Sequence, residues 1–331
     1  MRVAIFSAKK YEREFLSAAN ASYGHDLVYF DSRLEPETAS LAAGFVAVSV
    51  FVNDCADGET VRVLAGGGTR LVATRSTGFN HVDLKAASRH GIAVVRVVDY
   101  SPYSVAEFAV GLLLALNRKI HRAYNRTRDG NFELDGLMGF DFHGRCVGLI
   151  GTGKIGRVFA GIMRGFGCDI RGYDKFPNRE FTAAGGTYTD LDDICALADI
   201  ISLHCPLTHE THHVINARTL ATMKPGTLLV NTSRGGLIDT DAAIAALKSG
   251  RLGGLALDVY EQETELFFQD LSSEIIIDDV IQRLVSFPNV IVTGHQAFFT
   301  REAVGTIAAT TLESIADFEA GRPLRNQVAL A

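Results

Sequence analysis

Six residues near the middle of the chain combine three glycines with the start of a helical pattern. They read Gly151-Thr152-Gly153-Lys154-Ile155-Gly156 and stand between an apolar, strand-like segment at 147–150 and a helical pattern at 157–163. Gly151 permits a tight turn, Gly153 lets the backbone approach a pyrophosphate, and Gly156 allows a helix to pack closely on a strand. The free N–H groups and the dipole of that helix favour a diphosphate. The segment therefore predicts a dinucleotide site.

An acidic residue indicates which dinucleotide binds. Asp174 comes 18 residues after the last of these glycines, at the end of the strand-like segment 170–173. An acid there binds the ribose hydroxyls of NAD and repels the 2′-phosphate of NADP, although Lys175 weakens that exclusion. Residues 148–154 also match the GxxxxGK loop of nucleoside triphosphatases, but Ile155 stands where that loop needs a hydroxyl to bind magnesium. We therefore expect NAD as the cofactor.

Two further side chains could serve as a binding cation and as a proton donor in a dinucleotide-linked reduction, for instance of a 2-oxo acid. Arg234 and His295 each follow an apolar, strand-like segment, and ligands bind at the carboxyl edge of parallel sheets. A guanidinium can bind an oxo acid through two hydrogen bonds, and an imidazole can act as acid or base near neutral pH. A neighbouring carboxylate, Glu261 or Glu263, would orient the imidazole and favour its protonated form. Alone, each residue would more often be structural; beside a dinucleotide site they indicate hydride transfer.

Three segments, in this order, resemble the D-isomer-specific 2-hydroxyacid dehydrogenase family. They are Asn231-Thr232-Ser233-Arg234-Gly235, Leu257-Asp258-Val259-Tyr260-Glu261-Gln262-Glu263 and Gly294-His295-Gln296-Ala297-Phe298. Residues 100–107 and 295–300 look like the fermentative D-lactate dehydrogenases within that family, and the resemblance spans nearly the whole chain. It implies that Arg234 binds the substrate, that His295 donates the proton, and that Glu263 rather than Glu261 is its partner. The implied reaction is the reversible reduction of pyruvate to D-lactate by NADH. The alternatives are a larger 2-oxo acid as substrate, or an NADH-sensing, corepressor-like binding protein.

The resemblance also implies the remaining contacts. Backbone N–H groups of Thr77 and Gly78, in the loop that begins at Ser76, would bind the substrate carboxylate, and Tyr100 and Phe298 would wall a small pocket. The expected cofactor contacts are Gly151, Gly153, Lys154, Ile155, Gly156, Asp174, Cys205, Pro206, Thr232 and Asp258. Phe108 departs from the family, since many relatives carry His there. The tract at residues 209–213 contains three histidines, but we find no paired ligands elsewhere and expect no metal.

Composition excludes several other classes of protein. The net charge is 32 − 38 = −6, which disfavours nucleic acid or an anionic membrane as a partner. Five scattered cysteines, never spaced as CxxC, argue against a disulfide framework or a structural zinc site. The N-terminus has no signal-peptide pattern, and no apolar run approaches the ~20 residues of a membrane helix. We therefore expect a cytoplasmic protein whose partner is a small-molecule substrate.

The alternation of strand-like and helical segments places these residues in two domains. Apolar runs at 3–6, 46–50, 71–75 and 92–97 form a first set, and runs at 147–150, 170–173, 200–204, 227–231, 254–259 and 290–292 form a second. Such alternation predicts an α/β fold with doubly wound parallel sheets. We expect a flavodoxin-like substrate-binding domain of residues 1–100 plus 300–331 and a Rossmann NAD domain of residues 101–299, with a cleft between them. An apolar helix from 104 to about 124 is a candidate contact between domains or subunits, in a homodimer or homotetramer.

Overall fold

The computed structural model describes residues 1–328, apart from the side chain of Glu265, and separates into two compact units. One unit comprises Met1–Ser101 together with residues 299–328, and the other comprises Pro102–Phe298. The sequence-based assignment of residues 329–331 to the first domain lies outside the described residues. No helix in the described part of the chain is long and apolar enough to cross a membrane.

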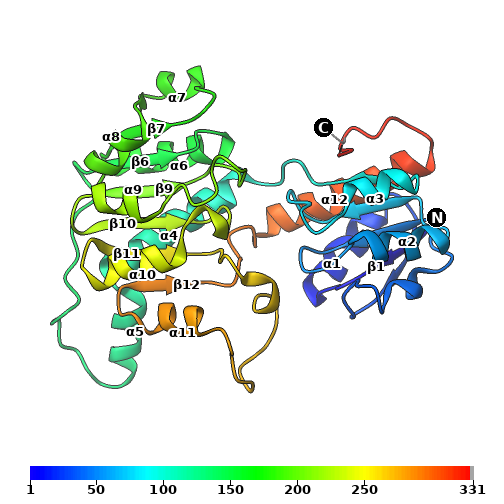
Figure 1. Cartoon of the computed structure of the whole chain (residues 1–331), viewed down its shortest axis with the longest axis horizontal. Helices are drawn as coiled ribbons and strands as arrows, with labels where there is room; N and C mark the ends of the chain where they lie inside the picture. The colour runs from blue at the N-terminus through cyan, green and yellow to red at the C-terminus, as the bar shows by residue number, and fades with distance from the viewer. Residues whose placement is uncertain (329–331) are drawn as a thin grey trace. The chain divides into compact units, whose positions relative to one another are not determined.

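The first unit, which begins at the N-terminus marked in Figure 1, is built on five parallel strands in the order β2-β1-β3-β4-β5. This is the flavodoxin-like strand order. Its elements are β1 (Arg2–Ile5), α1 (Lys10–Asn20), β2 (Asp26–Tyr29), η1 (Ala39–Ala42), β3 (Ala47–Val50), α2 (Gly58–Gly66), β4 (Leu71–Thr74), α3 (Leu84–Arg89), β5 (Ala93–Val95) and α12 (Arg301–Glu319). One hydrophobic core joins the sheet to η1, α2 and α3, and the other joins it to α1 and α12. Helix α12 therefore brings the end of the chain back into the first unit.

The second unit is built on seven parallel strands in the order β12-β11-β10-β9-β6-β7-β8. The order reverses between β6 and β9, which makes this the switch point at which doubly wound sheets bind ligands. Its elements are α4 (Pro102–Arg118), α5 (Ile120–Arg128), β6 (Cys146–Ile150), α6 (Lys154–Gly165), β7 (Asp169–Tyr173), α7 (Arg179–Ala183), β8 (Thr187–Tyr188), α8 (Leu191–Leu197), β9 (Ile200–Leu203), α9 (Ala217–Thr222), β10 (Thr227–Asn231), η2 (Gly235–Leu237), α10 (Thr240–Lys248), β11 (Leu252–Leu257), η3 (Glu263–Glu265), α11 (Asp279–Ser286) and β12 (Val290–Val292).

The core of the second unit lies on both faces of its sheet. Buried side chains of α4 and α6 pack on one face, and those of α8, α9, α10 and α11 pack on the other. Covering both faces explains why most of the strands read as continuous apolar runs rather than as alternating patterns. The prediction of two doubly wound parallel sheets is confirmed.

Two sequence-based expectations were wrong in detail. The helix expected from 104 to about 124 is two helices, because Lys119 adopts a left-handed backbone (φ 52°) between α4 and α5. The apolar residues of α4 pack against α6, β10 and β11 of the same unit, and a contact of this helix with another domain or subunit stays a prediction. Strands β2 and β8 were missed because both are short, lie at sheet edges and contain no fully buried residue.

Candidate active site

The glycine loop lies at the switch point, between β6 and α6. Gly151 has φ 102°, and a Cβ there would lie 2.4 Å from the backbone nitrogen of Cys205, so only glycine fits against the loop that follows β9. A Cβ on Gly156 would lie 2.3 Å from the Gly151 carbonyl oxygen. Gly153 is the N-cap of α6, receives no side-chain cap and faces open space. The N-terminus of α6 is therefore a cradle in which backbone N–H groups can bind a diphosphate.

Asp174 fixes the glycine loop to the end of β7. Its Oδ2 accepts hydrogen bonds from the Thr152 nitrogen (2.6 Å) and hydroxyl (3.0 Å), and its Oδ1 accepts from the Phe176 nitrogen (2.9 Å). The neighbouring Lys175 pairs through Nζ with the Glu210 carboxylate at 2.7 Å. Because that pair holds the lysine cation, Lys175 is less available to attract a 2′-phosphate, which supports NAD over NADP.

The segments after β9 and β10 complete the cofactor side. Cys205 is buried, which raises the pKa of its thiol to about 12, and its carbonyl accepts from the Ser233 hydroxyl (2.7 Å). Pro206 next to it is exposed. The hydroxyl of Thr232 is buried and has no hydrogen-bond partner within the described residues. Since a buried polar atom requires a partner, a cofactor hydroxyl or amide would satisfy it, and the residues present therefore fit NAD.

Two other predicted cofactor residues open α6. Lys154 is its exposed first residue, and Ile155 is half-buried against the core formed by α4 and α6. Their contacts with the diphosphate stay predictions. Phe108, where many relatives carry His, packs partly against the same core, so an apolar side chain suits that position.

Arg234 follows β10 in a loop that its neighbours hold in place. Nδ2 of Asn231 donates to the Arg234 carbonyl (2.8 Å), and Oδ1 of Asn231 accepts from the Ser233 nitrogen (3.0 Å). The next residue, Gly235, has no room for a side chain, because a Cβ there would lie 2.1 Å from the carbonyl carbon of Tyr260. Among the side chains the structure describes, the Arg234 guanidinium has no acidic partner; its Nη1 donates to the Ser233 carbonyl (2.6 Å). The cation is therefore available to an acidic ligand.

His295 and Glu263 meet at the carboxyl edge of the same sheet. His295 Nδ1 is 2.9 Å from Glu263 Oε1, and Glu263 Oε2 accepts from the Tyr260 nitrogen at 2.9 Å. The two side chains are 20% and 25% exposed. His295 has φ 55°, a conformation that residues other than glycine adopt infrequently. Because Nδ1 faces the carboxylate, Nε2 is the ring nitrogen left to exchange a proton with a ligand.

Asp258 fixes the turn that presents His295. Its Oδ1 accepts from the Thr293 hydroxyl (2.6 Å) and the Gln296 nitrogen (2.8 Å), and its Oδ2 accepts from the Ala297 nitrogen (2.8 Å). Burial raises the pKa of Asp258, and these hydrogen bonds counteract part of that rise. The carboxylate thus holds both flanks of His295. Its predicted contact with the nicotinamide stays a prediction.

In the first unit, the predicted substrate loop follows β4, and three of its carbonyls accept hydrogen bonds from side chains of the same unit. The Ser76 carbonyl accepts from the Thr74 hydroxyl (3.0 Å), the Thr77 carbonyl from Arg96 Nη1 (3.1 Å), and the Gly78 carbonyl from the Ser76 hydroxyl (2.6 Å). The N–H groups of Thr77 and Gly78 have no partner within residues 1–328. They are therefore free to bind an anion, which is what the sequence predicts for them.

The base of this loop is held by a buried ion pair. Arg75 Nε donates to Glu12 Oε1 (2.7 Å), and its Nη2 donates to the Phe6 carbonyl (2.7 Å). Tyr100 and Phe298, the predicted pocket walls, are both half-buried, Tyr100 in the first unit and Phe298 at the end of the second. Their contact with substrate stays a prediction.

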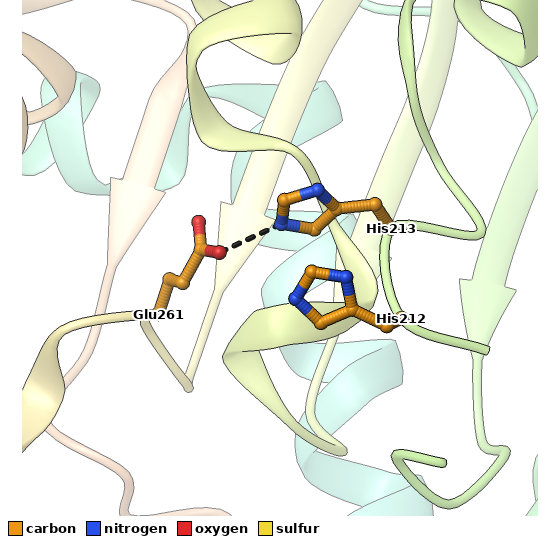
Figure 2. A group of neighbouring side chains, drawn as sticks. All are labelled: His212, His213 and Glu261. Carbon is orange, nitrogen blue, oxygen red and sulfur yellow. Dashed lines mark hydrogen bonds and ion pairs between the residues drawn. The ribbon is translucent and has the colours of Figure 1, made fainter. Parts of the chain in front are cut away.

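The histidine tract at 209–213 does have a potential ligand elsewhere in the chain, which the sequence analysis did not find, while the expectation that no metal binds stays untested. The structure brings Glu261, from the loop after β11, to His212 and His213 (Figure 2). The sequence analysis missed it because the partner is 48 residues from His213 along the chain, and only the fold shows that the two loops are adjacent.

Several positioning residues also escaped the sequence reasoning. Asn231, Gly235 and Tyr260 all lie within the segments that carry the family resemblance, but each acts by contacting backbone atoms of a neighbouring segment. The signal that could have indicated one of them is the pair Gly235-Gly236 directly after an arginine, because consecutive glycines often mark a close backbone approach.

Comparisons with known proteins identify the family of this chain. The family model described as "D-isomer specific 2-hydroxyacid dehydrogenase, NAD binding domain" matches residues 110–297. The chain is 52% identical to "2-hydroxyacid dehydrogenase homolog 1" of Schizosaccharomyces pombe, covering 96% of each chain. It is 46% identical to the D-lactate dehydrogenase of Escherichia coli, covering 99% of this chain and 100% of that one. A solved structure described as the pyruvate reductase of Chlamydomonas reinhardtii superposes with a TM-score of 0.94 at 43% identity, covering 98% of each chain.

The chain belongs to the D-isomer-specific 2-hydroxyacid dehydrogenase family. It is an NAD-dependent dehydrogenase, and the second unit, with its glycine loop, contains the matched NAD-binding domain.

Proposed function

We propose that the enzyme reduces pyruvate to D-lactate, with His295 as the proton donor, Glu263 as its partner and Arg234 as the substrate-binding cation. The observation that carries this proposal is the 2.9 Å contact between His295 and Glu263. Their loops lie at the same sheet edge as Arg234, which has no acidic partner among the side chains that the structure describes. The D-lactate dehydrogenase and pyruvate reductase named above support the choice of substrate.

The protein residues have distinct tasks in the reaction pyruvate + NADH + H⁺ → D-lactate + NAD⁺. NADH, when bound, supplies the hydride that reduces C2. Arg234 binds the oxo acid and draws electron density toward its oxygens. The proton on His295 Nε2 passes to the carbonyl oxygen as the new C–H bond forms, and Glu263 stabilises the imidazolium before the transfer. In the reverse direction the neutral imidazole accepts the hydroxyl proton.

The test is a panel of 2-oxo acids with the purified enzyme. NADH oxidation is followed with pyruvate, 2-oxoisocaproate and phenylpyruvate, and the lactate enantiomer is identified by chiral chromatography. We expect the highest kcat/KM with pyruvate and a product of D configuration. L-lactate as the product, or a larger acid as the best substrate, would refute the assignment of substrate.

The role of His295 needs a separate measurement. We expect His295→Ala to lower kcat by about 10²–10⁴-fold, the range that general acids contribute, while a fluorescence titration shows NADH binding close to wild type. An equal loss of NADH binding would show that His295 supports the fold of the site rather than proton transfer.

A further inference from the structure

A second group of potential ligands lies outside the residues used by the reaction. His212 and His213, in the segment between β9 and α9, face Glu261 from the loop after β11 (Figure 2). His213 Nε2 is 2.7 Å from Glu261 Oε1, and the two imidazole rings stack with their centroids 3.9 Å apart. One ligand atom from each of the three residues lies within 4.8 Å of the others.

The backbone holds His213 in an uncommon conformation. Its φ is 50°, in the left-handed region that residues other than glycine seldom adopt. Its N–H donates to the Gly236 carbonyl (2.9 Å), and its carbonyl accepts from Asn216 Nδ2 (2.8 Å). Strain of this kind persists only where surrounding contacts impose it, and it gathers at functional sites.

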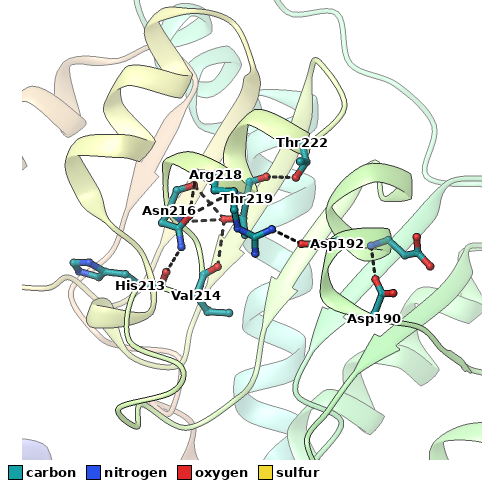
Figure 3. A network of polar contacts seen from close by, with 9 residues as sticks. Asp190, Asp192, His213, Val214, Asn216, Arg218, Thr219 and Thr222 are labelled. Atoms are coloured by element: carbon teal, nitrogen blue, oxygen red, sulfur yellow. Dashed lines mark hydrogen bonds and ion pairs between the residues drawn. The ribbon is translucent and has the colours of Figure 1, made fainter.

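A capped helix anchors those contacts. Figure 3 shows Asn216 at the start of α9, where its Oδ1 accepts from the Arg218 nitrogen (3.0 Å) and the Thr219 nitrogen (3.3 Å). The Arg218 side chain pairs with Asp192 of α8 at 2.7 Å. The segment with the two histidines is thus tied to two helices of the second unit, and His213 is positioned before any ligand binds.

Glu261 is oriented from its other side. Its Oε2 accepts from the hydroxyl of Thr240 at the start of α10 (3.1 Å), which leaves Oε1 directed at His213. A carboxylate that is hydrogen-bonded through one oxygen and turned toward imidazoles through the other has the outer contacts typical of a metal ligand.

We propose that His212, His213 and Glu261 bind a Zn²⁺ ion. Two imidazoles and one carboxylate form a ligand set that zinc uses, with a fourth position left to water, and imidazole nitrogen discriminates against Mg²⁺ and Ca²⁺. Zinc bonds of about 2.0–2.1 Å in a tetrahedron place the ligand atoms roughly 3.4 Å apart. On zinc binding, the distance between His213 Nε2 and Glu261 Oε1 therefore increases from 2.7 Å, and the His212 ring moves closer to both. Since His212 and Glu261 are exposed, their side chains can make this adjustment without moving the core.

A bound ion would join two loops near the catalytic residues. Glu261 stands two positions before Glu263, and the intervening turn is held by the hydrogen bond from the Tyr260 nitrogen to Glu263. Zinc would connect this turn to the segment after β9. We therefore expect the ion to stabilise the second unit by RT ln(1 + [Zn²⁺]/Kd), whatever substrate the enzyme uses.

The experiment uses the full chain without an affinity tag, freed of metal by a chelator. Calorimetric titration with ZnCl₂ in a non-chelating buffer is expected to show one ion per chain, and Tm is expected to rise with zinc concentration. MgCl₂ is expected to produce neither effect. We expect H212Q and E261Q to raise Kd for zinc at least about tenfold, since even outer contacts of a metal are worth 10–100-fold in affinity. Because the His212 side chain makes no hydrogen bond within the described residues, H212Q removes no hydrogen bond of the fold and alters only the stacking on His213.

Two matched controls separate this site from other places where zinc could bind. H209Q removes an exposed histidine of the same segment that lies outside the group, and H295N removes the His295–Glu263 pair. Both are expected to bind zinc as the wild type does. Absence of zinc binding in the wild type, or binding that survives H212Q and E261Q but is lost in H295N, would overturn the proposal.

Discussion

Replacement of Glu263 by glutamine tests how the catalytic pair is held. The carboxylate has two acceptor oxygens, one facing His295 Nδ1 and the other facing the Tyr260 nitrogen. An amide has one acceptor and one donor group. Since the Tyr260 N–H is a fixed donor, the amide oxygen would turn to it and the NH₂ group would face Nδ1. The Nδ1–H of a protonated imidazole would then face the NH₂ group of the amide, and two donors cannot form a hydrogen bond.

The size of the effect follows from the lost interaction. A hydrogen bond to a charged group contributes about 1.5–3 kcal/mol, which corresponds to a rate change of roughly 10- to 150-fold. The two side chains are 20% and 25% exposed, so solvent screens part of this energy. We therefore expect kcat for pyruvate reduction to fall by about 10- to 50-fold in Glu263→Gln, the lower part of that range.

Steady-state kinetics with two companion variants check this reasoning. Glu263→Asp keeps the charge and is expected to recover part of the lost kcat. Glu274→Gln removes a charge from an exposed position that follows Glu263 in the chain, and its kcat is expected to match that of the wild type. NADH affinity is expected to be the same in all three variants. If Glu263→Gln turned over as fast as the wild type, or if Glu263→Asp were no better than Glu263→Gln, the proposed partnership would be refuted.

Three further predictions follow from the second unit. Gly235→Ala places a Cβ 2.1 Å from the carbonyl carbon of Tyr260. We therefore expect the variant to lose about 1–3 kcal/mol of stability and to have a lower kcat. A variant with the kcat and the urea midpoint of the wild type would contradict the close approach. Asp174→Asn removes a charge that repels a 2′-phosphate, and the repulsion between like charges about 4 Å apart costs about 1 kcal/mol or more. We therefore expect the ratio of kcat/KM with NADPH to kcat/KM with NADH to rise at least about fivefold. An unchanged ratio would argue against this role of Asp174. Burial lowers the pKa of His204 to about 3 from 6.5, so the unfolded chain takes up the proton first as pH falls. The contribution of neutral His204 to the free energy of unfolding is complete above pH 6.5 and declines toward pH 3, by about 2 kcal/mol at pH 5. In urea unfolding, His204→Gln should therefore lose less stability between pH 7 and pH 5 than the wild type. An equal loss in both proteins would disprove this role of His204.

The buried strands could be predicted from the sequence because their signal is local. Strands β10 and β12 have the bounds that their apolar runs predict, and α12 begins and ends where the helical pattern does. A helix break such as Lys119 is harder to foresee, since lysine favours helices and only its left-handed backbone interrupts α4 and α5. The short edge strands β2 and β8 lack the buried run on which the prediction depends.

The site could be predicted to the extent that strand ends determine it. Arg234, Asp258 and His295 follow β10, β11 and β12, which are neighbours in the sheet, so an alternation of strands and helices is enough to place them along one edge. The choice of Glu263 over Glu261 came from the family pattern alone. The structure shows a physical difference between the two, because Glu263 contacts His295 and Glu261 contacts His213.

The contacts that hold the site in place could not be predicted from local sequence patterns, because they join different loops through backbone atoms. Gly235 lets the loop of Arg234 lie against Tyr260, whose N–H in turn holds Glu263. Asp258 holds the flanks of His295 with its two oxygens. Each proposed catalytic side chain is therefore positioned by a residue that need not touch the substrate. It follows that substitutions at Gly235 or Asp258 should lower kcat by up to about 10²-fold, because a misplacement of about 1 Å costs on the order of 10²-fold in rate.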